Sequence, residues 1–164
     1  MFDTLTNTVI SCVPPFVQAA GVAALENSLA DRDAMMGSFR EKLSPMVKAL
    51  NAIPDVTCLF PGGSFYTFPN VSAVCNRHRI SSHGLAMYLL EGADSNTGVA
   101  CLGGECFGEA GAGFIRLSSS LPESDLLRAI AFMHDAFENT DAIEQYLREN
   151  KGYSLSKPYP TENL

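Results

Sequence analysis

A short apolar strand with one arginine inside it most constrains how this chain can fold. The segment GFIRLS contains that arginine, Arg116, and follows a glycine-rich stretch. Because side chains alternate along a strand, Arg116 shares one face with Phe114 and Ser118. Ile115 and Leu117 then lie on the opposite face, which must pack against a core. A sheet of this kind is buried on one side, so we expect an α+β layer with helices on one face of a small, mostly antiparallel sheet.

The remaining elements follow from hydrophobic periodicity and from turn residues. Pro14 and Pro15 fit the first turn of a helix, and Ser81 or Ser82 can cap a later one. Ser120 and Glu123 have the spacing of a capping box for the last strong helix. The pattern predicts helices at 14–24, 31–50, 81–92 and 120–137, a hairpin of strands 56–60 and 65–68 around the turn PGGS, and strands at 99–102 and 114–118.

Composition limits the classes of partner. The chain has 164 residues, a net charge of −7 and no apolar run long enough to cross a bilayer, so we expect a single globular domain. The eleven basic residues form no extended positive face, so neither nucleic acid nor a membrane is an expected partner. Five cysteines without a CxxC pair, and residues 1–11 without the pattern of a signal peptide, favour the cytoplasm.

Arg116 is the strongest candidate for a binding residue. The ordinary interpretation of an arginine on a strand is a surface pair with a carboxylate, which contributes about 0–1 kcal/mol. The alternative is a clamp at the rim of a cleft, since the planar guanidinium can hold a carboxylate through two parallel hydrogen bonds. The long glycine-rich loop before the strand favours the clamp, because such loops often have a function.

Two other patterns resemble binding motifs but lack the context that such motifs need. Gly108, Gly111 and Gly113 resemble a phosphate-binding string, but they precede a strand, whereas a dinucleotide fingerprint follows one and opens a helix. Cys75, His78 and His83 lack a fourth ligand at a familiar spacing, so a solvated loop is expected there and no metal site is assigned.

Two single residues also have ordinary interpretations. His134 is expected to be a packed, hydrogen-bonded imidazole on the apolar side of the last helix, and Cys106 a small apolar residue. No arrangement of a nucleophile with a base, and no carboxylate pair, can be identified, so no catalytic residue is assigned.

Three segments resemble the C-terminal, small domain of class I/II, fold type I, pyridoxal-phosphate-dependent aminotransferases, the aspartate aminotransferase superfamily. SCVPPFVQAAGVAALE is similar to a family helix of pattern Q-x-A-x-x-A-L, and LFPGGSFYTFPNV to the hairpin P-x-G-[GAS]-[FY]-[FY]. The segment from Gly98 to Leu126 resembles V-x-x-x-P-G-x-x-F-G-x-x-G-x-x-R-[IL]-S, with Leu102 in place of the usual proline. The likeness spans 6–137. It implies an aminotransferase small domain with its interdomain helix over 1–138. Beyond this domain, a weaker amphipathic pattern with Ile143, Tyr146 and Leu147 predicts a C-terminal helix followed by a polar tail, over 139–164.

This resemblance implies a function and site residues. Arg116 would bind the α-carboxylate of the substrate, and Ser64 and Phe65 would lie near the substrate side chain. Substrates of the family are amino acids and 2-oxo acids, which exchange an amino group through pyridoxal 5'-phosphate, and the whole enzyme is a homodimer in most members.

The same resemblance implies that part of the enzyme is missing here. The family's Schiff-base lysine lies ahead of all three segments, and none of Lys42, Lys48, Lys151 and Lys157 is so placed. We therefore expect the cofactor-binding large domain to be absent and the isolated chain to be inactive. A non-catalytic binding or oligomerisation module of the same fold, or a lyase or synthase of the superfamily, are the alternatives.

Overall fold

The computed structural model describes residues 12–27 and 29–161. The expectation about a signal peptide concerns residues 1–11, which lie outside this range, as does the beginning of the segment that resembles the family. The chain divides into two compact units, 1–38 and 39–164.

The first unit contains helix α2, Pro15–Asn27, and the beginning of helix α3, Leu29–Leu50. The predicted start of α2 is confirmed, because Pro14 precedes the helix and its carbonyl accepts hydrogen bonds from Val17 and Gln18. Within its own unit α2 leaves Phe16 and Leu25 exposed, at 75% and 81% of their surface.

The second unit is an α+β layer around a three-stranded sheet, as predicted. Strand β3, Ile115–Ser118, lies between β1, Tyr66–Thr67, and β2, Leu102–Gly103, and both pairings are antiparallel. Helices α4 (Ser72–His78), α5 (Ser82–Met87), α6 (Glu123–Glu138) and α7 (Thr140–Glu149) surround this sheet, together with the π-helical turn η1 (Tyr88–Gly92) and the 3₁₀ turns η2 (Gly104–Phe107), η3 (Glu109–Gly111) and η4 (Lys151–Tyr153).

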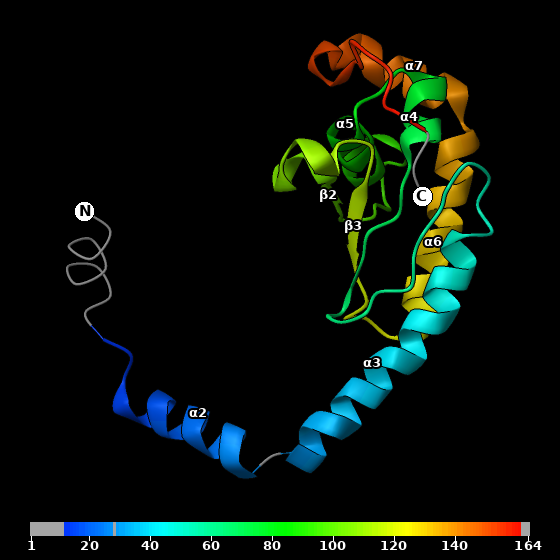
Figure 1. The fold of residues 1–164 in the computed structure, drawn as a ribbon. Helices are drawn as coiled ribbons and strands as arrows, with labels where there is room; N and C mark the ends of the chain where they lie inside the picture. The colour runs from blue at the N-terminus through cyan, green and yellow to red at the C-terminus, as the bar shows by residue number, and fades with distance from the viewer. Residues whose placement is uncertain (1–11, 28, 162–164) are drawn as a thin grey trace. The chain divides into compact units, whose positions relative to one another are not determined.

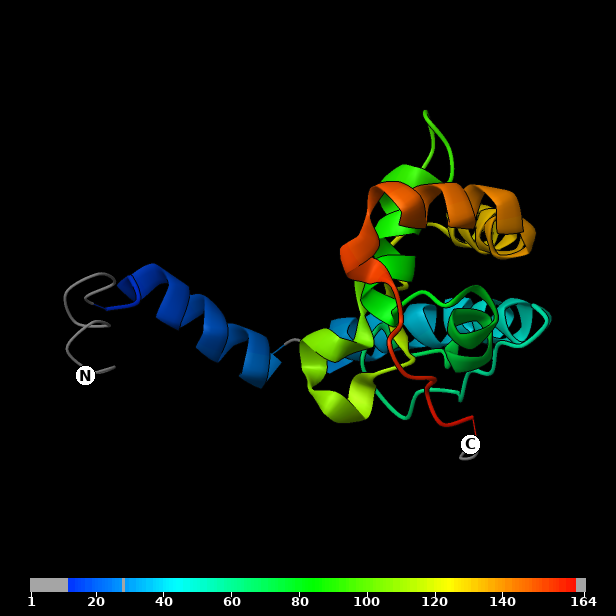
Figure 2. The ribbon, with the colours of Figure 1, turned by 90° about the horizontal axis from the view of Figure 1, so that it is seen from above.

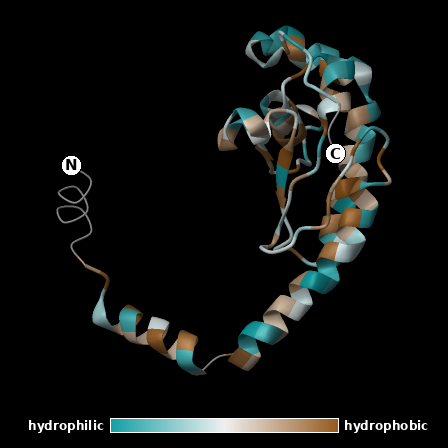
Figure 3. Ribbon diagram, in the orientation of Figure 1, coloured by the Kyte–Doolittle hydropathy of each residue, from teal (hydrophilic) through white to brown (hydrophobic). Residues whose placement is uncertain are grey.

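The predicted alternation along β3 is confirmed. Ile115 and Leu117 are buried at 0% and 5% exposure, whereas Arg116 is only partly covered. Figure 3 shows this alternation as hydrophobic and hydrophilic segments along the strand. The buried face joins a core that includes Leu50 of α3 and Phe137 of α6, while α7 lies beside η1 (Figure 2). This packing fixes which face of β3 presents Arg116.

The predicted hairpin is wrong in its first strand. Residues 56–60 form only an isolated bridge, Thr57 to Asn70, and β1 pairs with β3 instead. The reason is the side chain of Asn51, which donates to the carbonyl of Cys58 at 2.9 Å and accepts from its N–H at 2.8 Å. The backbone N–H and carbonyl of Cys58 therefore bond to the side-chain amide of Asn51, and they do not need a neighbouring strand as a partner. Similarly, the strand expected at 99–102 is reduced to β2.

Of the predicted helix caps, one is wrong and one is confirmed. The capping box is wrong, because Pro122 is the N-terminal flank of α6 and the hydroxyl of Ser120 lies 2.5 Å from that of Ser118. Ser81 does cap α5, since its hydroxyl accepts from the N–H of Gly84 at 3.0 Å. His134 is not packed inside: its side chain is 46% exposed and contacts Asp135.

Cys75 and His78 belong to a helix that the sequence did not predict, not to a solvated loop. Both residues lie on α4 and are buried, at 0% and 8% exposure. Burial raises the pKa of the Cys75 thiol, and His83 meets the ring of Tyr153 edge-on, with ring centres 5.7 Å apart. Across the described ranges, no group of three or more potential ligands is placed to hold a metal ion. Cys106 is exposed on η2 and is therefore not a packed apolar residue.

In the part of the chain that the structure describes, none of the helices combines the length and the apolar character needed to cross a bilayer.

Candidate functional site

The candidate site is built around the guanidinium of Arg116, at the centre of the sheet. Its carbon atom Cζ lies 4.3 Å from the ring centre of Tyr66 on β1 and 5.0 Å from that of Phe107 on η2. Contacts of this kind stabilise a cation by about 0.5–2 kcal/mol, depending on exposure. Two aromatic rings therefore stabilise the positive charge of Arg116, a role that a carboxylate more often has.

Among the described residues, no carboxylate forms an ion pair with Arg116. Stacking uses the flat faces of the guanidinium, whereas its N–H donors point outward in the plane. Within the described ranges the guanidinium contacts these two rings and donates no side-chain hydrogen bond, so its N–H donors are available to another molecule. A planar anion such as a carboxylate has the geometry to use two of these donors at once.

Further aromatic residues extend the surface on both sides of Arg116. Phe68 stacks on Phe114 at 5.2 Å and meets Phe107 edge-on at 5.9 Å. On the other side Phe65 contacts Tyr66 at 4.4 Å. Phe65, Phe68 and Phe107 remain 38–50% exposed, so the cation lies within an accessible aromatic surface.

The two other residues predicted for the site lie in the loop before β1. Phe65 is held in place through its carbonyl, which accepts from both the N–H and the hydroxyl of Ser119, at 2.8 and 2.9 Å. Its ring reaches Arg116 only through Tyr66. Ser64 is exposed and has a left-handed backbone with φ of 68°. Its hydroxyl forms no hydrogen bond within the described ranges.

The glycine-rich segment before β3 folds back on itself. The N–H of Gly104 donates to the carbonyl of Phe114 at 2.7 Å, and a side chain at Gly104 or at Gly111 would overlap the carbonyl of the other. These two glycines are therefore needed for close backbone packing. The compact turn that results is what brings Phe107 over Arg116.

A buried network behind this turn was not anticipated from the sequence. Tyr159 donates its hydroxyl to Glu105 at 2.6 Å and accepts from the N–H of Ser82 at 3.1 Å, and the hydroxyl of Ser82 accepts from Gly113 at 3.0 Å. Burial raises the pKa of Glu105, but hydrogen bonds from Ser82 and Tyr159 lower it more, so the net pKa is below its usual range. Burial and the bond to Glu105 raise the pKa of Tyr159 to about 12.

This network attaches the last residues of the chain to the glycine turn. Asn76 on α4 reinforces it by bonding to both backbone groups of Tyr159, at 2.8 and 2.9 Å. The sequence predicts a polar tail here, and its only signal of ordered structure is a tyrosine between two prolines, Pro158 and Pro160. Likewise, nothing in the sequence indicated that Tyr66 and Phe107 would contact Arg116, because neither residue is charged.

Comparison with known proteins identifies the relatives of this chain. An aspartate aminotransferase of Pyrococcus horikoshii is 33% identical over 132 residues, which are 79% of this chain and 32% of that protein. A putative aminotransferase of Bacillus subtilis is 33% identical over 122 residues, 74% of this chain and 29% of that protein. No protein-family model matches the chain.

Solved structures agree with this result. The aspartate aminotransferase of Rhizobium meliloti superposes with a TM-score of 0.66 at 29% identity, over 82% of this chain and 34% of that one. An aromatic aminotransferase of Pyrococcus horikoshii gives a TM-score of 0.66 at 25% identity, over 90% and 35%. The chain is homologous to one segment of the proteins of the aspartate aminotransferase superfamily.

This aminotransferase homologue spans about a third of the length of the relatives that it matches. A putative aminotransferase of Clostridium difficile, 22% identical with a TM-score of 0.67 over 83% of this chain and 33% of that one, has the same fold and was crystallised with pyridoxal phosphate bound.

Proposed function

We propose that this chain is the C-terminal part of a pyridoxal-phosphate-dependent aminotransferase, with Arg116 as the residue that binds the α-carboxylate of an amino acid or a 2-oxo acid. The observation that carries the proposal is the guanidinium of Arg116, which lies over the rings of Tyr66 and Phe107 and forms no ion pair among the described residues. The homology to aminotransferases supplies the reaction class.

The residues of this chain fit the carboxylate end of a substrate, but they do not fit the cofactor. Covalent attachment of pyridoxal phosphate needs a lysine inside an enclosed site. Lys48, Lys151 and Lys157 are exposed, and Lys42 lies over the ring of Phe39 at 5.5 Å. The cofactor, its lysine and the proton transfers would therefore belong to a large domain outside this chain, and the isolated chain would not transaminate.

In this proposal the chain has two tasks. Arg116 holds one end of the substrate through paired, charge-assisted hydrogen bonds, which fixes the orientation of the reacting carbon. Phe65 and the exposed aromatic side chains around it form an apolar wall, and Phe65 and Ser64 are the residues proposed to lie near the substrate side chain. Water is excluded on this side by the rings.

The test compares the isolated chain with the complete protein. We expect the 164-residue chain, incubated with one equivalent of pyridoxal phosphate and reduced with borohydride, to give only slight labelling spread over its exposed lysines, with no stoichiometric adduct at one position, as measured by intact mass and peptide mapping. The complete protein should transfer amino groups between an amino-acid panel and 2-oxo acids. In it, Arg116→Gln should lower kcat/KM by about 10²–10³-fold, since hydrogen bonds to charged groups contribute about 1.5–3 kcal/mol each.

The matched control is Arg128→Gln, because Arg128 is 83% exposed on α6. Two results would contradict the proposal: a stoichiometric cofactor adduct on a single lysine of this chain, or a complete enzyme whose kcat/KM is the same with glutamine at position 116. A complete protein without any cofactor domain would instead support a non-catalytic module.

A further inference from the structure

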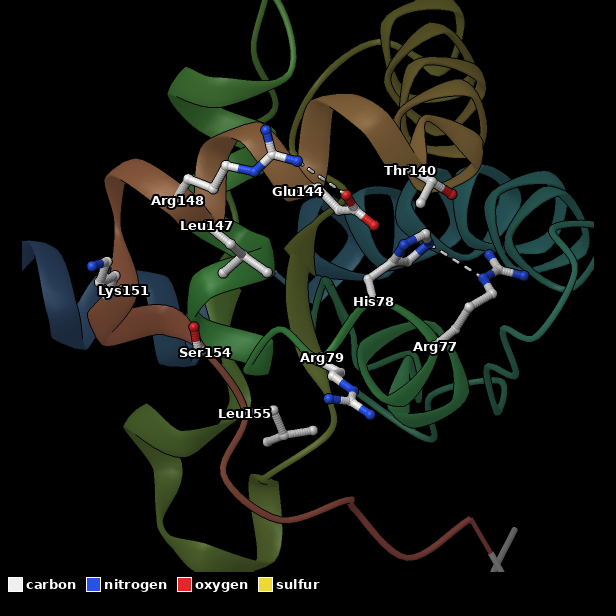
Figure 4. A pocket seen from close by; sticks show the side chains of 10 residues that line it. All are labelled: Arg77, His78, Arg79, Thr140, Glu144, Leu147, Arg148, Lys151, Ser154 and Leu155. Atoms are coloured by element: carbon white, nitrogen blue, oxygen red, sulfur yellow. Dashed lines mark hydrogen bonds and ion pairs between the residues drawn. The ribbon is translucent and has the colours of Figure 1, made fainter.

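A second group of positively charged side chains lines a hollow elsewhere in the fold, and neither Arg116 nor the aromatic residues around it belong to this lining. The hollow has a volume of about 660 Å³ and lies between the C-terminal end of α4, helix α7 and residues 151–155 (Figure 4). Small-molecule sites in proteins are typically about 300–1,000 Å³. Of the eleven lysines and arginines of this acidic chain, four line it: Arg77, Arg79, Arg148 and Lys151.

The charges in the hollow are not balanced. Glu144 is the one carboxylate in the lining, and it pairs with Arg148 at 3.4 Å. Arg77 is committed to two carboxylates outside the lining. Among the described residues, Arg79 and Lys151 form no ion pair. The hollow therefore holds two cations that an anion from solution can neutralise.

The backbone at Arg79 is unusual. The residue ends α4 in the left-handed conformation, with φ 55° and ψ 36°, where glycine or asparagine is the ordinary choice. Its carbonyl accepts from the N–H of Leu155 at 2.7 Å, which fixes this turn against the C-terminal segment. Arginine is strained in this backbone conformation, and strained residues are concentrated at functional sites.

His78 lies in the same wall and can report on binding. Its Nε2 is 2.8 Å from the carbonyl oxygen of Phe137, which can only accept a hydrogen bond, so Nε2 carries a proton. A protonated Nε2 has no lone pair to offer, so the 3.3 Å contact with Nε of Arg77 is not a hydrogen bond. Burial is the main cause that lowers the pKa of His78, with the charge of Arg77 adding to it. A bound anion would raise this pKa.

We propose that this hollow is a binding site for a small phosphate-bearing anion. In the view of Figure 4, Arg148 and Arg79 lie on opposite sides with His78 and Leu147 between them, and Lys151 lies at the edge. Arginine offers paired donors that match the oxygen atoms of phosphate, and lysine adds a point charge. The side chains of Leu147 and Leu155 provide an apolar wall for the organic part of the ligand.

The experiment titrates the full 164-residue chain with pyrophosphate and follows binding by calorimetry and by the imidazole NMR signals of His78. We expect saturable binding at constant ionic strength and a higher His78 pKa in the complex. Arg79→Asn, which suits the left-handed backbone, should weaken binding at least about tenfold, and Lys151→Gln about threefold. Malonate should bind at least about tenfold more weakly than pyrophosphate.

Arg128→Gln is the control for loss of one positive charge elsewhere and should bind pyrophosphate like the unaltered chain. Urea unfolding of each variant checks that the fold is kept, and Lys151→Gln serves as the test if Arg79→Asn does not fold. Binding that does not saturate, equal affinity for malonate, or equal losses in the pocket variants and in Arg128→Gln would overturn the proposal.

Discussion

Arg116 and Arg77 are two arginines of one fold that are satisfied in opposite ways. Arg77 donates to Asp55 at 2.8 Å and to Glu138 at 3.0 Å, so its in-plane donors already have partners. Arg116 is held by the faces of two rings, and its in-plane donors have no carboxylate among the described residues. The ion pairs of Arg77 join segments of the chain to each other, whereas the ring contacts of Arg116 leave its charge without a counterion among the described residues.

The largest effect expected from this difference is on catalysis by the complete enzyme. Arg116→Lys keeps the charge but loses the fork of paired donors, so kcat/KM should fall about 100-fold, or about 2.7 kcal/mol. The free energy of unfolding of the chain, from urea denaturation, should change by less than about 0.5 kcal/mol. Steady-state kinetics that are unaltered, together with a large loss of stability, would make Arg116 a structural residue like Arg77.

A charge that bonds to another part of the chain should affect stability instead. Glu105 is such a case: its Oε1 accepts from Tyr159, while its buried Oε2 has no hydrogen-bond partner among the described residues. Tyr159→Phe removes the 2.6 Å hydrogen bond to its carboxylate and should lower the free energy of unfolding by about 1–2 kcal/mol at pH 8, discounted for partial exposure. In the folded chain the pKa of Tyr159 is raised from 10.0 to about 12, so this contribution is complete below pH 10 and is lost as the pH rises from 10 to 12.

Urea unfolding of both proteins at pH 8 and above pH 10 measures this dependence. The difference in stability between them should shrink as the pH rises. A difference that stays constant over this range would show that the hydroxyl of Tyr159 does not stabilise the fold through Glu105.

Arg77→Gln should cost less, about 1 kcal/mol in the free energy of unfolding. Its side chain is 37% exposed and those of its partners are 48% and 51% exposed, so solvent screens both pairs. The loss should become smaller in 0.5 M NaCl, because exposed pairs are screened by salt. Arg128→Gln, whose contact with Asp125 is 3.6 Å long, is the matched control and should change stability by less than about 0.3 kcal/mol. An Arg77 effect that is equal at both salt concentrations would contradict this account of the pairs.

The smallest effect concerns the rings that hold Arg116. Tyr66→Leu removes one aromatic face and should raise the KM for the amino-acid substrate about two- to fivefold, which corresponds to about 0.5–1 kcal/mol. Tyr66→Phe keeps the face and should leave KM unchanged. If the phenylalanine variant shows the same loss as the leucine variant, the hydroxyl of Tyr66 matters and stacking does not explain the orientation of Arg116.

The sequence by itself determined the class of fold and the strand that carries the candidate binding residue. Alternation along β3 fixed which face carries Arg116, and periodicity located the long helices, because both signals are local and repeat along the chain. The family motifs added the reaction class, which no spacing could supply.

Only the tertiary structure decided what surrounds Arg116. The stacking of Tyr66 and Phe107 on it joins residues 50 and 9 positions away in the sequence, and the attachment of Tyr159 to Glu105 spans 54 positions. The loss of the predicted strand at 56–60 has a more local cause: the side chain of Asn51 bonds to the backbone of Cys58, and a bond from one side chain leaves no periodic signal in the sequence. Contacts between distant segments depend on how whole elements pack, and a single sequence records no periodic signal for them.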